Sequence, residues 1–155
     1  MNDKEFTEEA IRLAVENVAQ GGGPFGAVLV TANGNQYEGT NRVTALNDPT
    51  AHAEVLAIRA AAADEGFDLS GSTLYSSCEP CPMCLTAALW ARVDRIVYAA
   101  TEDDAAAAGF DDASFYTQLR DGLKSVKDAR LTHLKLEDRR APFEAWDANP
   151  GHAEY

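Results

Sequence analysis

The 155-residue sequence contains few cysteines and no long apolar run. Its apolar segments are far shorter than the roughly 20 residues that a membrane-spanning helix needs, so a bilayer span is excluded. Met1 is not followed by a basic and then an apolar segment, so we expect no signal peptide and a cytoplasmic location. The three cysteines are too few for a four-thiolate iron–sulfur cluster. Their crowding between Cys78 and Cys84 favours metal or redox chemistry over a disulfide framework.

Basic residues are also scarce. The chain has 13 Lys and Arg against 25 Asp and Glu, which gives a formal net charge of −12. Such a surface repels phosphate backbones and anionic membranes, and its long-range field favours neutral or cationic ligands. Solubility alone is the commoner reason for an acidic chain, so the charge excludes partners better than it identifies them. We therefore expect neither a nucleic acid nor a membrane as a partner.

The composition and the order of apolar patterns predict one α/β domain over residues 1–155. With 46% hydrophobic and 25% charged residues, the chain resembles ordinary globular domains and is long enough to bury a core. A first helix and a hairpin precede strands and helices in alternation. That order implies a three-layer α/β/α sandwich with a mixed central sheet and helices on both of its faces.

The individual elements are expected from apolar periodicity and from turn residues. Asn33-Gly34 supplies the two-residue turn of the hairpin, and Asn-Asp-Pro-Thr at residues 47–50 supplies a turn and a helix cap. Helices are expected over residues 3–20, 51–65, 80–90, part of 101–127 and 142–149. Strands are expected over residues 25–31, 36–43, 73–77, 95–100 and 131–136.

Two short motifs carry the candidate chemistry: His-Ala-Glu at residues 52–54 and Pro-Cys-Pro-Met-Cys at residues 80–84. A histidine nitrogen and two thiolates suit Zn²⁺, and three protein ligands leave the fourth tetrahedral position open for water. We therefore predict one Zn²⁺ per subunit, held by His52, Cys81 and Cys84, with Glu54 close by as the catalytic residue. The order H-x-E followed by P-C-x-x-C is the signature of zinc-dependent base deaminases.

The expected helices can bring these residues to one point. His52 and Glu54 lie in a first helical turn, where side chains tilt back toward the N-terminus. Cys81 and Cys84 share one face at the start of the next helix, and its N-terminus favours thiolate over thiol. Bound zinc would lower the pKa of water from 15.7 to roughly 7, so that hydroxide serves as the nucleophile at neutral pH. Glu54 would carry protons from this water to the substrate and to the departing amine.

The cysteines are also compatible with a structural metal site. A closed site made of His52, Cys78, Cys81 and Cys84 would leave no position for water, and the protein would then be a zinc-stapled interaction module. Glu54 discriminates between the hypotheses, because a purely structural site has no need of it. A thioredoxin-like role for Cys78 and Cys81 is less consistent with the sequence, since the βαβ partner pattern is not apparent.

The sequence resembles the cytidine-deaminase-like superfamily and, within it, the short bacterial guanine deaminases. The superfamily motifs are Asn-Asp-Pro-Thr-Ala-His-Ala-Glu at residues 47–54 and Ser-Cys-Glu-Pro-Cys-Pro-Met-Cys at residues 77–84. Gly-Phe-Asp-Asp at residues 109–112 and the C-terminal tyrosine suggest guanine as the substrate. The resemblance covers nearly the whole chain and implies a hydrolase that converts guanine to xanthine and ammonia.

The resemblance also implies which residues bind the purine base. Asn41 and Asp112 would hydrogen-bond the purine, and Phe25 would help to form the pocket. Tyr155 would enter the active site of a partner subunit through a swapped C-terminal segment of about residues 137–155, which makes the protein a homodimer. Taken alone, these residues have simpler roles: core for Phe25, turn or cap for Asn41 and Asp112, and a frayed terminus for Tyr155.

Other amine-bearing substrates remain open: tRNA adenosine, cytosine or cytidine, and an aminotriazine. The tRNA adenosine deaminases carry a similar Asp-Pro-Thr-Ala-His-Ala-Glu stretch. Their substrate is a large polyanion, which calls for a basic, salt-sensitive surface that this acidic chain does not offer. The sequence therefore favours a small neutral heterocycle.

Overall fold

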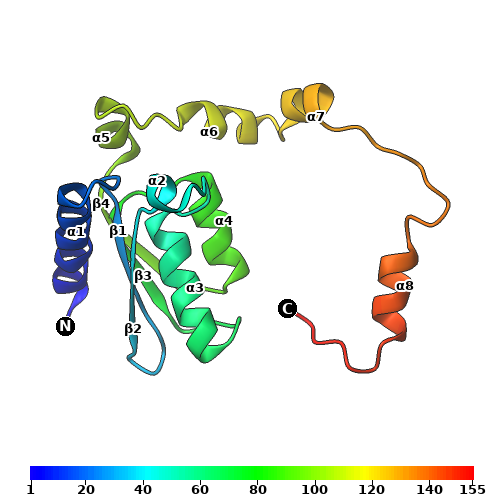
Figure 1. The fold of residues 1–155 in the computed structure, drawn as a ribbon, viewed down its shortest axis with the longest axis horizontal. Helices are drawn as coiled ribbons and strands as arrows, with labels where there is room; N and C mark the ends of the chain where they lie inside the picture. The colour runs from blue at the N-terminus through cyan, green and yellow to red at the C-terminus, as the bar shows by residue number, and fades with distance from the viewer. The chain divides into compact units, whose positions relative to one another are not determined.

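The computed structural model describes residues 1–155, which form two compact units, Met1–Ser114 and Phe115–Tyr155. Figure 1 shows the order of the elements along the chain. The first unit contains α1 (Asp3–Ala19), β1 (Gly26–Val30), β2 (Gln36–Thr40), α2 (Val43–Leu46), α3 (Ala53–Glu65), β3 (Thr73–Cys78), α4 (Pro82–Trp90), β4 (Arg95–Ala100) and α5 (Glu102–Ala107). Helix α6 (Ala113–Arg120) begins in this unit, and α7 (Lys124–Arg130) and α8 (Ala141–Ala148) lie in the second. That the whole chain is one domain stays a prediction.

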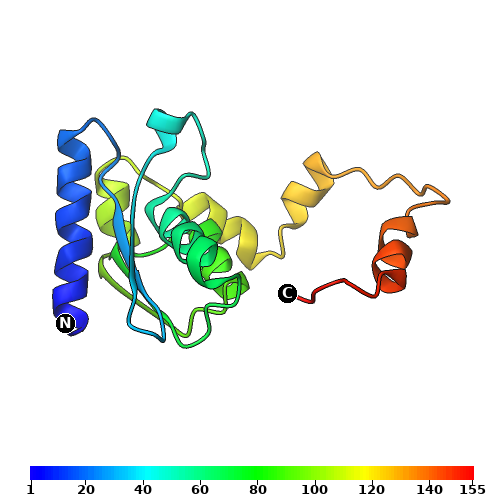
Figure 2. The same ribbon diagram turned by 60° about the horizontal axis from the view of Figure 1, so that its bottom comes forward.

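The first unit is built on a four-stranded sheet in the order β2-β1-β3-β4. Strand β1 pairs antiparallel with β2 and β3, whereas β3 and β4 are parallel, so the sheet is mixed. Helix α1 covers one face, and α3 and α4 cover the other (Figures 1 and 2). The predicted three-layer α/β/α sandwich is therefore confirmed.

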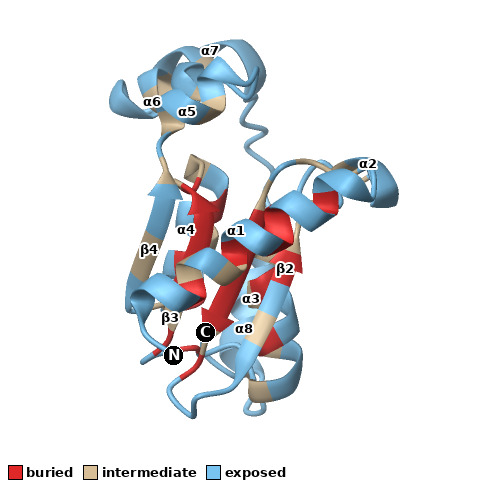
Figure 3. Cartoon of the chain, turned by 90° about the vertical axis from the view of Figure 1, so that its left-hand side faces the viewer, coloured by how far each residue is buried: buried red, intermediate tan, exposed pale blue.

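The alternation of side chains along the strands supplies a core on each face of the sheet. Val28 packs with Phe6 and Leu13 of α1, whereas Leu29 packs with Leu74 on the side of α3 and α4. Figure 3 shows the buried residues gathered on the strands and on the inner sides of these helices. Two apolar layers thus hold the helices that carry the candidate site.

Helix α3 lies unusually close to the sheet because both partners have small residues. A Cβ atom added at Gly39 of β2 would lie 2.0 Å from the carbonyl oxygen of Ala53. On the helix side, Ala53, Ala57 and Ala61 are fully buried. This backbone-to-backbone contact seats the first turn of α3, and with it His52 and Glu54, against the sheet.

Two of the element boundaries that differ from the prediction lie where a side chain bonds to nearby backbone. The strand expected over residues 36–43 ends at Thr40, and Asn41 Oδ1 accepts a hydrogen bond from the Val43 N–H at the start of α2. The helix cap expected within residues 47–50 is wrong, because the N-cap of α3 is His52. Asp48 Oδ1 accepts bonds from the Thr50 N–H and hydroxyl, and α3 begins two residues later than expected, at Ala53.

The strand expected over residues 131–136 is also wrong. These residues are irregular, and Leu131, Leu134 and Leu136 are exposed. Apolar residues in a short segment do not make a strand by themselves, since a strand needs a neighbouring strand for its backbone hydrogen bonds. The helix expected within residues 101–127 is divided into α5, α6 and α7, and the terminal helix is confirmed as α8.

The second unit ends in a tail that folds back on α8. Asn149 Oδ1 accepts a hydrogen bond from the Gly151 N–H, and the His152 ring stacks on Trp146 with the centroids 4.6 Å apart. Tyr155 meets the same indole edge-on, at 6.3 Å between centroids. None of residues 115–155 is buried. Across the chain, no helix combines the length and apolar character that crossing a membrane requires.

Candidate active site

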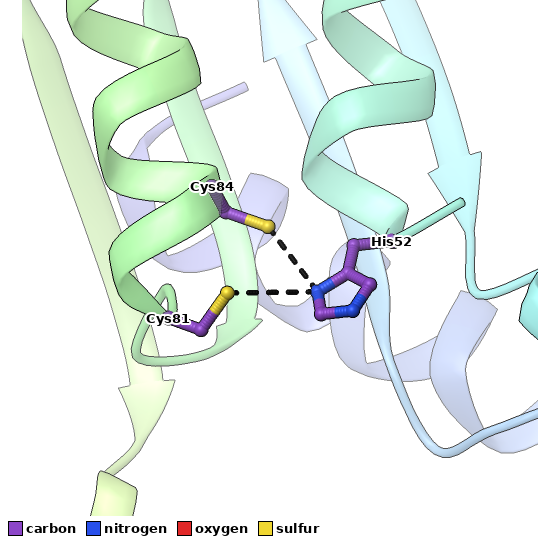
Figure 4. Close-up of side chains that lie close together, drawn as sticks. All are labelled: His52, Cys81 and Cys84. Carbon is purple, nitrogen blue, oxygen red and sulfur yellow. Dashed lines mark hydrogen bonds between the residues drawn. The ribbon is translucent and has the colours of Figure 1, made fainter. Parts of the chain in front are cut away.

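His52, Cys81 and Cys84 converge at the starts of α3 and α4 (Figure 4). The Nδ1 atom of His52 lies 3.6 Å from Cys81 Sγ and 3.4 Å from Cys84 Sγ. Bonds of about 2.3 Å to sulfur and about 2.0 Å to nitrogen at a tetrahedral angle place the two ligand atoms about 3.5 Å apart. The three side chains, whose ligand atoms all lie within 4.8 Å of one another, therefore fit one zinc ion.

Local backbone geometry explains this convergence. His52 and Cys81 are the N-cap residues of α3 and α4, and both have extended backbone that turns the chain into the helix. Pro82 occupies the first helical position, where a fixed φ favours the helix and the missing N–H is harmless. Cys84, one turn further on, is fully buried. The predicted meeting of the two motifs at helix N-termini is confirmed by these contacts.

Glu54 lies beside this cluster and is only 5% exposed. Its Oε1 atom accepts a hydrogen bond of 3.2 Å from the Ser76 hydroxyl, and the Cys84 thiol points to Oε2 at 3.6 Å. Burial raises the pKa of Glu54 above the ordinary value of 4.5. The raised pKa makes this carboxyl group a better proton acceptor than an exposed glutamate.

The two cysteines of the cluster shift each other's pKa in opposite directions. The interaction with Cys84 and the nearby His52 lowers the pKa of Cys81, whereas the interaction with Cys81 and burial raise the pKa of Cys84. The hydrogen bond with Cys81 also raises the pKa of His52. The lowered pKa of Cys81 favours a thiolate at that position, and binding of a metal ion would favour loss of the Cys84 proton as well.

Cys78 stands apart from the cluster. Its thiol points to the Thr101 carbonyl oxygen at 3.7 Å, and burial raises its pKa to about 11. The group that could hold a metal ion consists of His52, Cys81 and Cys84 alone. The structure thus does not assemble the closed four-ligand site that the sequence left open.

A cavity of about 660 Å³ opens on the cluster and on Glu54. Three of the residues expected to bind substrate, Phe25, Asn41 and Asp112, line it. Burial raises the pKa of Asp112. Tyr155 lies in the second unit, where its side chain is 72% exposed. The structure therefore brings three of the four expected substrate residues to the predicted metal ligands.

Sequence reasoning missed several residues of the cavity wall. Phe110 meets Phe25 edge-on, with the ring centroids 5.0 Å apart. Its position in the Gly-Phe-Asp-Asp motif, two residues before Asp112, is the sequence feature that could have identified it. The wall also includes the glycine-rich loop Gly21–Gly23 and the carboxylates of Glu79, Glu102 and Asp111, but no lysine or arginine. The cavity thus offers aromatic surface and negative charge to a ligand.

The comparisons with known proteins agree with this site. Residues 1–100 match the family described as the cytidine and deoxycytidylate deaminase zinc-binding region. The chain belongs to this family of zinc-dependent deaminases. The fold, the deaminase class and the zinc cofactor expected from the sequence are thereby confirmed.

Within the family, the chain is 47% identical to the guanine deaminase of Bacillus subtilis over 148 residues, which is 94% of each chain. The X-ray structure of guanine deaminase from Bacillus subtilis matches with a TM-score of 0.91 at 46% identity, covering 100% of this chain and 99% of that one. The tRNA-specific adenosine deaminase of Haemophilus influenzae is 40% identical over 109 residues, 69% of this chain and 63% of its own.

Proposed function

We propose that this protein is a guanine deaminase, a hydrolase that converts guanine and water to xanthine and ammonia. The observation that carries the proposal is the His52, Cys81 and Cys84 cluster beside buried Glu54, in a cavity of about 660 Å³. A cavity of that size suits a small molecule. Support for guanine comes from the similarity to the Bacillus subtilis enzyme, which extends over 94% of both chains.

His52, Cys81 and Cys84 would hold one Zn²⁺ per subunit. When bound, zinc supplies Lewis acidity that makes water a nucleophile at neutral pH. The protein supplies one imidazole nitrogen and two cysteine sulfurs, and Cys81 at the N-terminus of α4 has the lowered pKa that favours a thiolate ligand. This donor set binds zinc firmly and leaves room for a water molecule.

Glu54 would act as the proton carrier. Its carboxyl group takes a proton from the attacking water, delivers it to a ring nitrogen, and helps a second proton reach the departing amine. A carbon–oxygen bond forms and the carbon–nitrogen bond breaks at the same ring carbon, so that ammonia leaves. The Ser76 hydroxyl, bonded to Glu54 Oε1, holds the carboxylate in place during these transfers.

Asn41 and Asp112 would bind the polar edge of the purine, and Phe25 would contact its ring face. An amide and a carboxylate match the alternating donors and acceptors of guanine, and an aromatic side chain matches its flat surface. Phe110, packed against Phe25, would extend this aromatic wall. All four residues line the cavity that opens on Glu54.

The acidic cavity wall favours a free base over a nucleic acid. Glu79, Glu102 and Asp111 line the cavity together with Asp112, and no cationic side chain offsets them there. The chain as a whole carries a formal charge of −12. A phosphate backbone approaching this surface would be repelled, which disfavours tRNA as the substrate.

The active form would be a cytoplasmic homodimer in which residues 137–155 are exchanged and Tyr155 completes the partner's site. Exposed apolar side chains support contact with a second copy of the chain. Phe143 is 70% exposed in the second unit, and Leu89 and Trp90 on α4 are 67% and 68% exposed. Large apolar groups at this exposure are typical of surfaces that pack against another chain. The free thiols that hold the metal suit a reducing compartment.

The experiment is an ammonia-release assay on zinc-loaded protein with a panel of purines, pyrimidines, an aminotriazine and tRNA. We expect guanine to be turned over with the highest kcat/KM, and a Glu54→Ala variant to retain zinc while losing at least about a thousandfold in kcat. Turnover of another substrate with guanine inactive would overturn the proposal. Full activity of Glu54→Ala would overturn the mechanism.

A further inference from the structure

Asn17 is a buried polar residue that the zinc and substrate chemistry does not use. It lies in the last turns of α1, and its side chain is 5% exposed. A buried carboxamide is costly unless its polar atoms are paired. Its NH₂ group meets this requirement by donating to two backbone carbonyl oxygens, those of Gly23 and Asn41, each at 2.8 Å.

These bonds join the end of α1 to the loop that follows it and to Asn41, which lies 24 residues further along the chain. Gly23 belongs to the loop between α1 and β1, and Asn41 follows the end of β2. The Asn17 backbone also takes part, because its carbonyl oxygen accepts the Gly22 N–H at 2.8 Å. One residue of α1 therefore fixes both the glycine loop and the chain at position 41.

The glycine loop is shaped to admit the Asn17 carboxamide. A Cβ atom added at Gly22 would lie 2.4 Å from Asn17 Nδ2, and one added at Gly23 would lie 3.0 Å from Asn41 Cγ. The loop therefore closes on the two asparagine side chains with no room for another carbon atom. This fit goes beyond what a generic helix-ending turn needs.

The two segments that Asn17 holds are parts of the cavity wall. Gly21, Gly22, Gly23 and Asn41 line the cavity together with Glu54. The Asn41 side-chain oxygen accepts the Val43 N–H at 3.2 Å, which leaves its NH₂ group as the donor available to a ligand. The backbone of Asn41 is held by Asn17 and the side chain by Val43, so both ends of the residue are fixed.

We infer that Asn17 is a positioning residue for purine binding: it orients Asn41 and the Gly21–Gly23 loop without touching the base. This inference rests on the proposed function, because it assigns Asn41 to the bound purine. A residue acting in this way affects the affinity for the base more than the chemical step. Its loss should therefore appear in KM and in equilibrium binding of a base, while kcat and zinc content change little.

Three variants test this role by different routes. Asn17→Ala removes both donated hydrogen bonds. Asn17→Asp keeps the volume but replaces the two-proton donor with an acceptor that faces two carbonyl oxygens. Gly22→Ala leaves residue 17 intact and displaces its carboxamide through the added Cβ. The matched control is Ser72→Ala, which removes a buried hydrogen bond to the Leu69 carbonyl oxygen outside the cavity wall.

The readouts are KM and kcat for guanine, zinc content, the unfolding midpoint, and calorimetric binding of hypoxanthine, which lacks the amine and cannot be deaminated. We expect all three variants to raise KM and to weaken hypoxanthine binding by about tenfold or more, with kcat within about threefold of the native value. Asn17→Asp should be at least as impaired as Asn17→Ala. Ser72→Ala should lower the unfolding midpoint and leave KM unchanged.

Failure of this inference can be distinguished from failure of the proposed function. If the native protein turns over guanine but the variants change KM no more than Ser72→Ala does, Asn17 is only structural and this inference is wrong. It is equally wrong if Asn17→Asp binds hypoxanthine like the native protein, because volume alone would then suffice. If the native zinc-loaded protein neither turns over guanine nor binds hypoxanthine, the proposed function fails and this inference fails with it.

Discussion

The Ser76 hydroxyl donates a 3.2 Å hydrogen bond to Glu54 Oε1, and both side chains are buried. Ser76 belongs to β3 and Glu54 to the first turn of α3, so the bond connects the central sheet to the helix that carries the proposed catalytic residue. A carboxylate held in this way has a restricted orientation. Through this bond the sheet restrains the Glu54 side chain.

Replacing Ser76 with alanine should therefore impair proton transfer. We expect Ser76→Ala to lower kcat for guanine by about tenfold, equivalent to about 1.4 kcal/mol, because the Glu54 carboxylate loses its fixed orientation. Zinc content should stay at one ion per chain. Steady-state kinetics and metal analysis would measure both. An unchanged kcat would show that Glu54 is positioned by its helix alone.

The arrangement of the three cysteines predicts how each will affect metal binding. Cys78→Ala should retain one zinc per chain, because its thiol points to Thr101 and lies outside the ligand group. Cys84→Ala should lose zinc, since two remaining ligands bind the ion weakly. A chelator should abolish activity, and added Zn²⁺ should restore it. Loss of zinc from Cys78→Ala would instead support the hypothesis of a closed four-ligand site.

The proposed exchange of C-terminal segments predicts complementation between two inactive variants. Glu54→Ala lacks the proton carrier, and Tyr155→Ala lacks the residue supplied to the partner. When the two chains are co-expressed, half of the dimers should be mixed, and each mixed dimer should hold one intact site, for about a quarter of native activity. Recovery of no activity, with mixed dimers verified by mass, would place Tyr155 in the site of its own chain.

The surface carboxylate of Glu65 should make part of the folding stability depend on pH in the acid range. It accepts hydrogen bonds from the Asn35 amide, the Thr31 hydroxyl, the Tyr37 hydroxyl and the Asn33 amide, which hold its pKa below the ordinary value of 4.5. The unfolded chain therefore takes up a proton before the folded chain does as the pH falls below about 4.5. The stabilisation is present above that pH and is lost as the pH falls through the folded pKa.

The test is a comparison of native protein with Glu65→Gln, which keeps an acceptor oxygen but does not titrate. Urea midpoints measured from pH 7 down to pH 3 should decline more steeply for the native protein below about pH 4.5 than for the variant. Parallel declines for the two proteins would show that the bonds to Glu65 do not depend on its charge.

The zinc motif and most of the elements could be predicted because both depend on neighbours in the chain. His52 and Glu54 are two residues apart, Cys81 and Cys84 are three apart, and each pair begins a helix that its own sequence encodes. The strand expected over residues 131–136 could not be judged in this way, because a strand also needs a partner. The local sequence pattern was sufficient to propose the metal ligands, but it could not show whether a segment finds another strand to pair with.

The amino-acid sequence was enough to predict the layered architecture and to propose the metal ligands and the proton carrier, since spacing along a helix or strand dictates which side chains share a face. The contacts that hold Asn41 and Glu54 at the cavity could be seen only in the tertiary structure. Asn17 and Asn41 are 24 residues apart, and Ser76 and Glu54 are 22 apart, with no periodicity to link them. Such pairs meet only when α1 and α3 pack on opposite faces of one sheet, because long-range contacts arise from packing rather than from local pattern.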